Sequence, residues 1–409
     1  MPAISARSWA ARTALVATAT LTLATGAAAV ATAAQVPSSR GGGSAAAAPS
    51  FRRACAAADK PGIASCLALI RTGGTWRAGV FARGKAPVGD GYGPADLISA
   101  YKLPTSKTAR KIAVVDAYND PNAASDLATY RKAWGLAACN TTTKAGCLTV
   151  TNQKGAASPL PTNSGTTGWA TEESLDVDMV AAICPSCHIY LVEANSPSVS
   201  NLGTAVNSSV GVLSAKFVSN SYGASQSSSD PSYDTLYYNH PGVAITAASG
   251  DTGPSVSYPA ASQYVTSVGG TTLTKAPGTP RGWKESAWAD SGHGCASFEP
   301  EPSWQMAYTT GCTSQRSDND VAADADPSTG VAVYDTYDQS GWLEVGGTSA
   351  SAPIIASVYA LAGAPATGTY PASYPYADLS GLFDLSPTGN PYYQPVGLGS
   401  PDGTSSFAG

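Results

Sequence analysis

The chain has 409 residues, among them 42 Gly, 29 Pro, 8 Cys and 3 His, and its formal net charge at pH 7 is −5. Hydrophobic residues make up 43% and charged residues 12%, which allows a large core and argues against wholesale disorder. Because Lys and Arg do not exceed Asp and Glu, the chain has no basic footprint for nucleic acid. Three widely spaced His are too few for a His-rich metal site.

The N-terminus has the pattern of a secretory signal peptide. Arg7 and Arg12 precede an apolar run at residues 14–30, and small residues at 31–34 suit cleavage near Gln35. A membrane anchor is the alternative, but a run of Ala and Thr rather than Leu makes a weak membrane span. We therefore expect residues 1–34 to be removed, and the remaining protein to be secreted, extracellular and free of the membrane.

Residues 35–90 are expected to form a linker and a short disulfide-containing prosegment, and residues 91–409 one large domain. The low-complexity stretch 35–50 is typical of a linker, and alternating strand and helix patterns begin near Gly91. Eight cysteines fall into close pairs, so pairing between neighbours is the simplest arrangement, although the sequence does not fix the connectivity. The pairs are Cys55/Cys66, Cys139/Cys147, Cys184/Cys187 and Cys295/Cys312.

Five short apolar runs are each typical of a strand that is buried on both faces. Helical patterns lie between them, and the first has Asp120 as its expected cap and Pro121 in its first turn. This alternation predicts an α/β fold, with a mostly parallel central sheet, helices on both faces, and chemistry at the carboxyl ends of the strands. The expected strands are 112–115, 189–192, 217–219, 243–246 and 265–268, and the expected helices are 120–134, 171–183, 201–213 and 351–362.

Two motifs place reactive side chains near helix starts. Gly346 and Gly347 permit a tight turn before Ser349, where the helix dipole favours negative charge, although an ordinary Ser cap has the same pattern. Glu172 and Asp176 are four residues apart and share a helical face. Two touching carboxyl groups split their titrations, so that one can act as a base at acidic pH. Acidic residues in a first turn also simply complement the helix dipole.

A third motif, ASGDTG at residues 248–253, follows a buried strand and exposes Asp251 at its carboxyl end, as a plain Asp-containing turn also would. In this order the three motifs resemble the sedolisins, the serine-carboxyl peptidases, which have a subtilisin-like fold. The GTSxSAP pattern around Ser349 also fits subtilisins, and the ExxLD and SGDxG patterns make the resemblance specific. It covers most of the chain, from Gly91 to Pro401.

The resemblance implies a role for each motif residue. Ser349 is the nucleophile, Glu172 takes and returns its proton, Asp176 orients Glu172 and shares its proton, and Asp251 lines the oxyanion hole. A carboxylate base works best near its own pKa, and Asp251 can donate a hydrogen bond only while protonated, so both demands imply an acidic working pH.

The resemblance also implies a polypeptide substrate. Ser221, Tyr222 and Gly223 resemble the strand edge that pairs with the substrate backbone, although a polar strand end is the plain alternative. We expect a monomeric endopeptidase, with tripeptidyl aminopeptidase activity as the other mode of the wider family.

Three further motifs suggest other kinds of site. Asp116 fits the Asp of a Ser-His-Asp triad loosely, but no His has a suitable context. The CPSCH sequence at residues 184–188 matches haem attachment formally, and a small disulfide loop is the better interpretation. Asp318, Asn319 and Asp320, with Asp324 and Asp326, lack the Gly and Glu of an EF-hand, which favours an acidic surface turn.

Two departures from the family stand out. Asp384-Leu385 matches the start of the family's calcium site, but Tyr393 takes the place of its second Asp, so calcium stays open as a cofactor with an incomplete site. The prosegment is also much shorter than the family's large folded one. These departures keep a non-catalytic exported binding or wall-associated protein as the alternative function.

Overall fold

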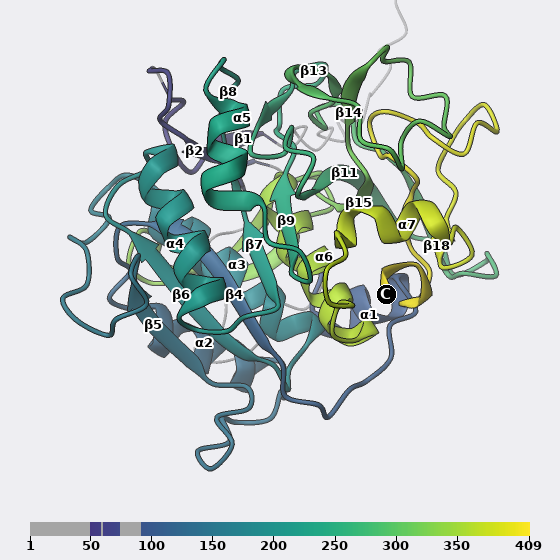
Figure 1. The fold of residues 1–409 in the computed structure, drawn as a ribbon. Coiled ribbons are helices and arrows are strands. Elements are labelled where there is room, and N and C mark those ends of the chain that lie inside the picture. Colours follow the sequence, from purple (N-terminus) through teal and green to yellow (C-terminus); the bar gives the residue numbers. More distant parts are fainter. Residues whose placement is uncertain (1–49, 59, 74–90) are drawn as a thin grey trace, which may run out of the picture. The chain divides into compact units, whose positions relative to one another are not determined.

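A central sheet carries the fold, with strands in the order β12-β11-β9-β7-β4-β6-β5, and β15 beside β11 (Figure 1). All its neighbours run parallel except β11 and β12, which are antiparallel. The strands are β4 Lys111–Ala117, β5 Leu148–Asn152, β6 His188–Ala194, β7 Phe217–Asn220, β9 Ala244–Ala248, β11 Thr266–Lys275, β12 Trp283–Ala287 and β15 Val321–Asp324. The predicted mostly parallel sheet is confirmed, and all five predicted strands belong to it.

This computed structural model describes residues 50–58, 60–73 and 91–409, which lie within one compact unit, Ala46–Gly409. The predicted signal peptide, and the predicted linker apart from Ser50, lie outside the described residues. No described helix has the length and apolarity that crossing a membrane requires.

Helices cover both faces of the sheet (Figure 1). Strand residues such as Ile112 and Val114 join one core with α3 and α6, whereas Ala113 and Val115 join a second core with α4, as the two-residue period of a strand dictates. The helices are α1 Pro94–Ala100, α2 Ala123–Ala133, α3 Trp169–Ile183, α4 Val199–Gly211, α5 Asp230–Tyr233, α6 Thr348–Ala362 and α7 Tyr374–Ala377, with a π-helix at Asp234–Tyr238 and 3-10 turns at Pro371–Ser373 and Ser405–Phe407.

The predicted start of α2 is two residues too early. The helix begins at Ala123 with Asn122 as its N-cap, and Asp120 instead accepts the Asn122 backbone N–H at 2.8 Å. The Asp120 N–H also donates to the carboxyl group of Glu173 on α3. Asp120 is therefore held by this buried neighbour and does not cap α2.

Smaller sheets complete the fold. One has the order β1-β3-β17-β16, and another the order β10-β8-β2, so the segment 51–71 contributes strands to both. The strands of the first are β1 Phe51–Arg53, β3 Leu69–Arg71, β16 Val331–Asp335 and β17 Gly341–Gly346. The strands of the second are β2 Ser65–Cys66, β8 Tyr222–Ser225 and β10 Ser257–Tyr258. Two further strand pairs are β13 Gly294–Pro300 with β14 Gln315–Asp318, and β18 Leu382–Phe383 with β19 Ser400–Pro401.

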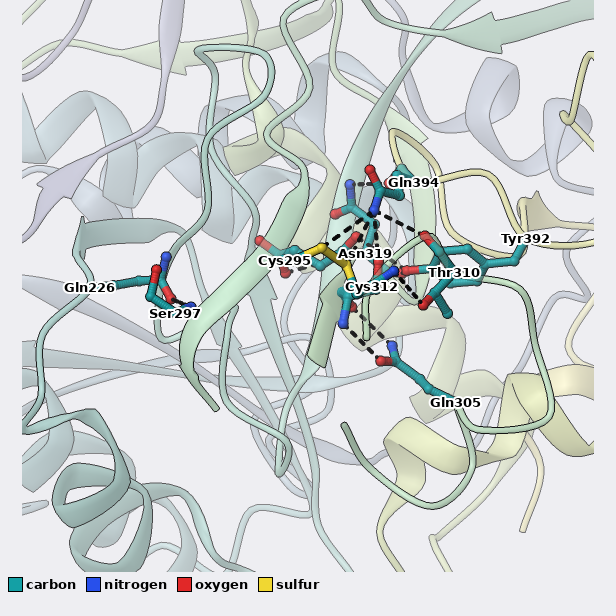
Figure 2. The surroundings of a disulfide bond; sticks show 11 residues. Gln226, Cys295, Ser297, Gln305, Thr310, Cys312, Asn319, Tyr392 and Gln394 are labelled. Carbon is teal, nitrogen blue, oxygen red and sulfur yellow. Dashed lines mark hydrogen bonds between the residues drawn. A yellow bond between two sulfur atoms is a disulfide. The ribbon is translucent and has the colours of Figure 1, made fainter. Parts of the chain in front are cut away.

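The four predicted cysteine pairs are all disulfides. Cys295–Cys312 joins β13 to the loop before β14, and the amide of Gln394 lies against it and donates to the Thr310 carbonyl at 3.0 Å (Figure 2). This disulfide therefore anchors the segment near residue 394 as well as the two residues it joins.

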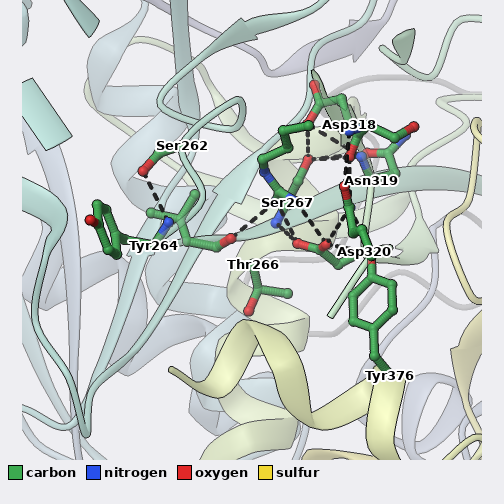
Figure 3. Close-up of polar contacts among 12 residues, drawn as sticks. Ser262, Tyr264, Thr266, Ser267, Asp318, Asn319, Asp320 and Tyr376 are labelled. Atoms are coloured by element: carbon green, nitrogen blue, oxygen red, sulfur yellow. Dashed lines mark hydrogen bonds and ion pairs between the residues drawn. The ribbon is translucent and has the colours of Figure 1, made fainter. Parts of the chain in front are cut away.

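The acidic stretch at 318–320 is not the surface turn that the sequence predicted. Asp318, Asn319 and Asp320 are fully buried, and Asp320 pairs with the buried guanidinium of Arg316 at 2.7 Å (Figure 3). Tyr376 donates a further hydrogen bond to Asp320 at 2.7 Å. Buried carboxylates are tolerated when they are paired and hydrogen-bonded in this way.

Candidate active site

The three sequence motifs converge where β9 ends and where α3 and α6 begin. β9 stops at Ala248, and the next turn carries Asp251, while Gly347 is the N-cap of α6 with φ 91° and ψ 160°. A side chain at Gly347 would be strained at this φ and would collide with the carbonyl oxygen of Leu67, so glycine is required here. The predicted start of α6 at Ser351 is three residues late, because the helix already includes Thr348 and Ser349.

Ser349 is fully buried in the first turn of α6. Its hydroxyl donates to the Ser221 carbonyl at 3.2 Å, and the Ser221 hydroxyl donates back to the Ser349 carbonyl at 3.3 Å. The Ser349 hydroxyl also lies beside Glu172 and lowers the pKa of that carboxyl in part. The predicted nucleophile and the predicted base are therefore neighbours.

Glu172 and Asp176 are both completely buried on α3. Burial is the largest cause that raises the pKa of each, and the charge of Asp116 is the next. In addition, the Glu172 charge raises the pKa of Asp176. The two carboxyls thus act on each other, as the four-residue spacing predicted, and they favour neutral, proton-sharing forms.

Asp116 is the site residue whose role the sequence did not reveal. It lies on β4, is fully buried, and burial raises its pKa to about 8. Neither oxygen of Asp116 has a hydrogen-bond donor among the described groups, whereas the Ser221 hydroxyl lies near Asp176 and lowers its pKa in part. Protons shared between the carboxyls would remove this deficit, because a protonated carboxyl is itself a donor. The feature of the sequence that could have indicated this role is the position of Asp116 at the carboxyl end of a buried strand.

Asp251 is buried against Thr348, the first residue of α6. Its Oδ1 accepts the Thr348 backbone N–H at 2.8 Å and the Thr348 hydroxyl at 2.9 Å. Its Oδ2 is buried without a partner among the described groups and points toward the position of a side chain on Gly347. Burial raises the pKa of Asp251 to about 7, so below neutral pH the carboxyl is protonated. Since Oδ1 already accepts two hydrogen bonds, the proton belongs on Oδ2.

The predicted substrate edge is occupied by the chain itself. β8 pairs antiparallel with β2, which places Ser65 opposite Gly223 and Cys66 opposite Tyr222. The Leu67 N–H then donates to the Ser221 carbonyl at 3.3 Å. This pairing could not be predicted from the sequence, because a two-residue strand is too short to show a periodic pattern.

The histidines take no part in this arrangement. His188 bonds to the Lys144 carbonyl and the Thr149 hydroxyl, His240 to Asn207, and His293 to the Ser291 carbonyl. Cys184 and Cys187 are joined in a disulfide, so the haem interpretation of the CPSCH sequence is wrong, because both sulfurs would be needed as thioethers.

The residues aligned with the family's calcium site do not fit that ion. Asp384 accepts the Ser386 N–H at 2.8 Å, and the Gly397 carbonyl is taken by the Tyr393 N–H at 2.9 Å. In the described part of the chain, no group of three or more His, Cys, Asp and Glu side chains is placed to hold a metal. The β18–β19 pairing instead ties this region together.

Comparisons with known proteins agree with the geometry. A family model described as Subtilase family matches residues 107–372. The chain is 29% identical over 310 residues to kumamolisin from Bacillus sp. (strain MN-32), covering 68% of this chain and 53% of kumamolisin. It is 26% identical over 327 residues to sedolisin from Pseudomonas sp. (strain 101), covering 71% and 53%. The chain thus spans about half the length of these curated relatives.

A solved structure of Pseudomonas sedolisin, a serine-carboxyl proteinase, superimposes with a TM-score of 0.62 at 22% identity, covering 77% of this chain and 96% of that one. Sphericase superimposes with a TM-score of 0.50 at 17% identity, covering 78% and 99%. These likenesses establish the subtilisin-like fold. With the family match and the curated relatives, they show that the chain belongs to the subtilase family, in its sedolisin group.

Proposed function

We propose that this protein is a secreted serine-carboxyl endopeptidase that hydrolyses polypeptides at acidic pH through Ser349, Glu172, Asp176 and Asp251. The observation that carries the proposal is the placement of the Ser349 hydroxyl beside the buried Glu172, with the histidines bonded elsewhere. A carboxylate is then the base available to this nucleophile. The signal pattern and the four disulfides support secretion.

In the acylation step, the Ser349 oxygen attacks the scissile carbonyl carbon while Glu172 takes the hydroxyl proton. Glu172 then gives this proton to the leaving amine. Glu172 is basic enough for this task because burial, and after it the charge of Asp116, raises its pKa well above the usual value of a carboxyl group. Water then attacks the ester on Ser349, with Glu172 taking its proton and returning it to the Ser349 oxygen. This step releases the acid product and restores the Ser349 hydroxyl.

Protonated Asp251 donates from Oδ2 to the oxygen of the tetrahedral intermediate. Thr348 holds the other oxygen of this carboxyl and so fixes its orientation before the reaction starts. The donor is lost when Asp251 ionises, near pH 7, so activity declines as the pH rises toward neutral.

An extended cleft supports endopeptidase action. The chain that occupies the cleft continues beyond Ser65, where Ala64 donates to the Pro197 carbonyl at 2.7 Å and Ile63 forms a bridge with Ser198. A peptidase that removed tripeptides would need a cleft that ends three residues before the scissile bond.

The test is hydrolysis of a denatured protein substrate from pH 3 to 8 by wild type, Ser349→Ala and Ser357→Ala. Ser357 is a buried serine further along α6 and is the matched control. We expect acid-limited activity in wild type and Ser357→Ala, and none in Ser349→Ala. Activity that peaks above neutral pH would contradict a carboxylate base, and a folded and fully processed wild type that is inactive at every pH would favour the binding-protein alternative.

A further inference from the structure

A cavity of about 850 Å³ lies beside α2. One wall is a face of this helix, on which Ala124, Ala128 and Arg131 follow one another at helical spacing. The other wall is the loop that leads into β5, and the Cys139–Cys147 disulfide of that loop also lines the cavity. Cavities that bind small molecules commonly have volumes of about 300–1,000 Å³. None of the described residues that line this cavity belongs to the candidate active site.

The charged side chains around the cavity are all positive. Arg131, Lys132 and Lys144 line it, and no Asp or Glu does so among the described residues. The rest of the lining is mostly apolar, with alanines, the disulfide and three leucines, Leu127, Leu136 and Leu148. A ligand that fits this lining must therefore combine an apolar body with a negative charge.

Arg131 is the buried cation of this cavity. It is only 5% exposed, burial lowers the pKa of its guanidinium, and no described carboxylate offsets this effect. Its Nε donates to the Ala137 carbonyl at 3.0 Å and its Nη2 to the Pro185 carbonyl at 2.9 Å. Nη1 has no partner among the described groups. Because a buried charge costs free energy unless it is paired and hydrogen-bonded, the two carbonyls leave Arg131 in need of an anion.

The surroundings of Arg131 leave space for its guanidinium. Gly146 has φ 70°, a value that favours glycine, and a Cβ there would come within 2.7 Å of Arg131 Nη2. The Thr149 hydroxyl, also in the lining, is already bonded to His188 at 3.0 Å. A peptide would bring N–H and C=O groups that so apolar a lining does not satisfy, whereas a hydrocarbon chain brings none.

We propose that this cavity binds a carboxylate carried by a hydrocarbon chain, with the carboxylate at Arg131 and the chain along Leu127 and Leu148. The planar guanidinium matches the geometry of a carboxylate, which supplies both the missing counter-charge and an acceptor for Nη1. The chain removes the apolar wall of the cavity from water. A cationic amphiphile with the same chain would instead meet three like charges.

The experiment titrates the full chain at pH 7 with dodecanoate, kept below its micellar concentration, and follows binding by calorimetry. Wild type is expected to bind dodecanoate saturably, and to bind dodecyltrimethylammonium and acetate about 10-fold more weakly or worse. Ala128→Trp fills the cavity from an exposed position and is expected to weaken dodecanoate binding by about 10-fold or more. Ala157→Trp, at an exposed alanine outside the lining, is the matched control and should bind as wild type does.

Arg131→Met removes the guanidinium and keeps much of the side chain's length. It is expected to bind dodecanoate about 10-fold more weakly or worse, with circular dichroism verifying its fold. If this variant does not fold, the comparison of head groups and Ala128→Trp decide the matter, because neither alters Arg131.

Three results would overturn the proposal. A folded wild type that binds no dodecanoate saturably shows that the cavity is not such a site. Equal binding of dodecanoate and dodecyltrimethylammonium shows that the positive side chains do not select the ligand. Binding that Ala128→Trp leaves unchanged places the ligand elsewhere on the protein. None of these measurements uses peptidase activity, so each result holds whether or not the protein is the proposed peptidase.

Discussion

Asp251 accepts both hydrogen bonds of Thr348, from the backbone N–H at 2.8 Å and the hydroxyl at 2.9 Å, on the same carboxyl oxygen. The second oxygen is left for a proton, and burial keeps that proton in place up to about pH 7. In the proposed oxyanion site, a buried carboxyl that must be neutral to donate makes the donor sensitive to pH, in contrast to a backbone N–H or an amide.

The first prediction follows from this pair. In Asp251→Asn the side-chain oxygen still accepts from Thr348 and the amide nitrogen donates at every pH. We expect it to keep part of the activity and to lose less of it between pH 5 and 7 than wild type does. Asp251→Ala removes the donor and is expected to lose about 10²–10³-fold in kcat.

The control for both variants is Thr252→Ala, which changes the exposed neighbour in the same turn. Measurement of kcat across the pH range decides the matter. Wild-type activity in Asp251→Ala at acidic pH would show that Asp251 does not stabilise the oxyanion.

The second prediction concerns Asp116 as a positioning residue. Asp116 titrates together with its neighbours Glu172 and Asp176, and whenever the shared proton leaves Asp116 its charge raises the pKa of the other two, so Asp116→Asn is expected to lower both pKa values. The acidic limb of the pH profile of kcat/KM should therefore move to lower pH. The shift is about one pH unit if the Asp116 charge disfavours ionisation of its neighbours by about 1.4 kcal/mol.

Asp178→Asn is the matched control, because Asp178 is buried on the same helix but accepts the Tyr334 N–H instead. A purely structural role for Asp116 would reduce activity at every pH without moving the profile, and that result would contradict the assignment.

The third prediction is that the fold is more stable in acid than at neutral pH. Burial raises the pKa of Asp318 to about 7, of Asp116 to about 8 and of Glu193 to about 9. Such carboxyls ionise near pH 4 in the unfolded chain but only at much higher pH in the folded protein. Their contribution to the free energy of unfolding is fully present below pH 4. It is lost as the pH rises from 4 toward 9, because the unfolded chain releases its protons at lower pH than the folded protein does.

Thermal unfolding of Ser349→Ala, which cannot digest itself, is expected to give a Tm several degrees higher at pH 4 than at pH 8. Asp318→Asn should flatten this dependence, and exposed Asp290→Asn should leave it unchanged. A Tm that rises steadily from pH 4 to 8 would contradict the raised pKa values.

The sheet and the motifs of the candidate site could be recognised in the sequence because both are local patterns: apolar runs for β4, β6, β7, β9 and β11, and short spacings around Ser349 and Glu172. It could not predict the burial of Asp318 and Asp320, which depends on the tertiary pairing of Asp320 with Arg316. Nor could it place β2 and β3 in the cleft, because strands of two or three residues leave no periodic signal and owe their register to partners far along the chain.

The last prediction concerns Leu67, which lies beside the candidate active site. Leu67 packs with Ala248 and Ala352 in a small apolar cluster, and its Cδ1 lies 3.6 Å from the place of a Cβ on Gly223. If Leu67 occupies the pocket that an external substrate uses, cleavage after Leu should exceed cleavage after Lys or Asp. Filling the pocket with Ala248→Leu should then shift the preference toward Ala, by about 10-fold or more in kcat/KM. Competing peptides that differ in this one residue measure the ratio, and Ala261→Leu, at a buried alanine of the other core, controls for a general packing effect. An unchanged ratio in folded Ala248→Leu would mean that external substrates place their side chain elsewhere.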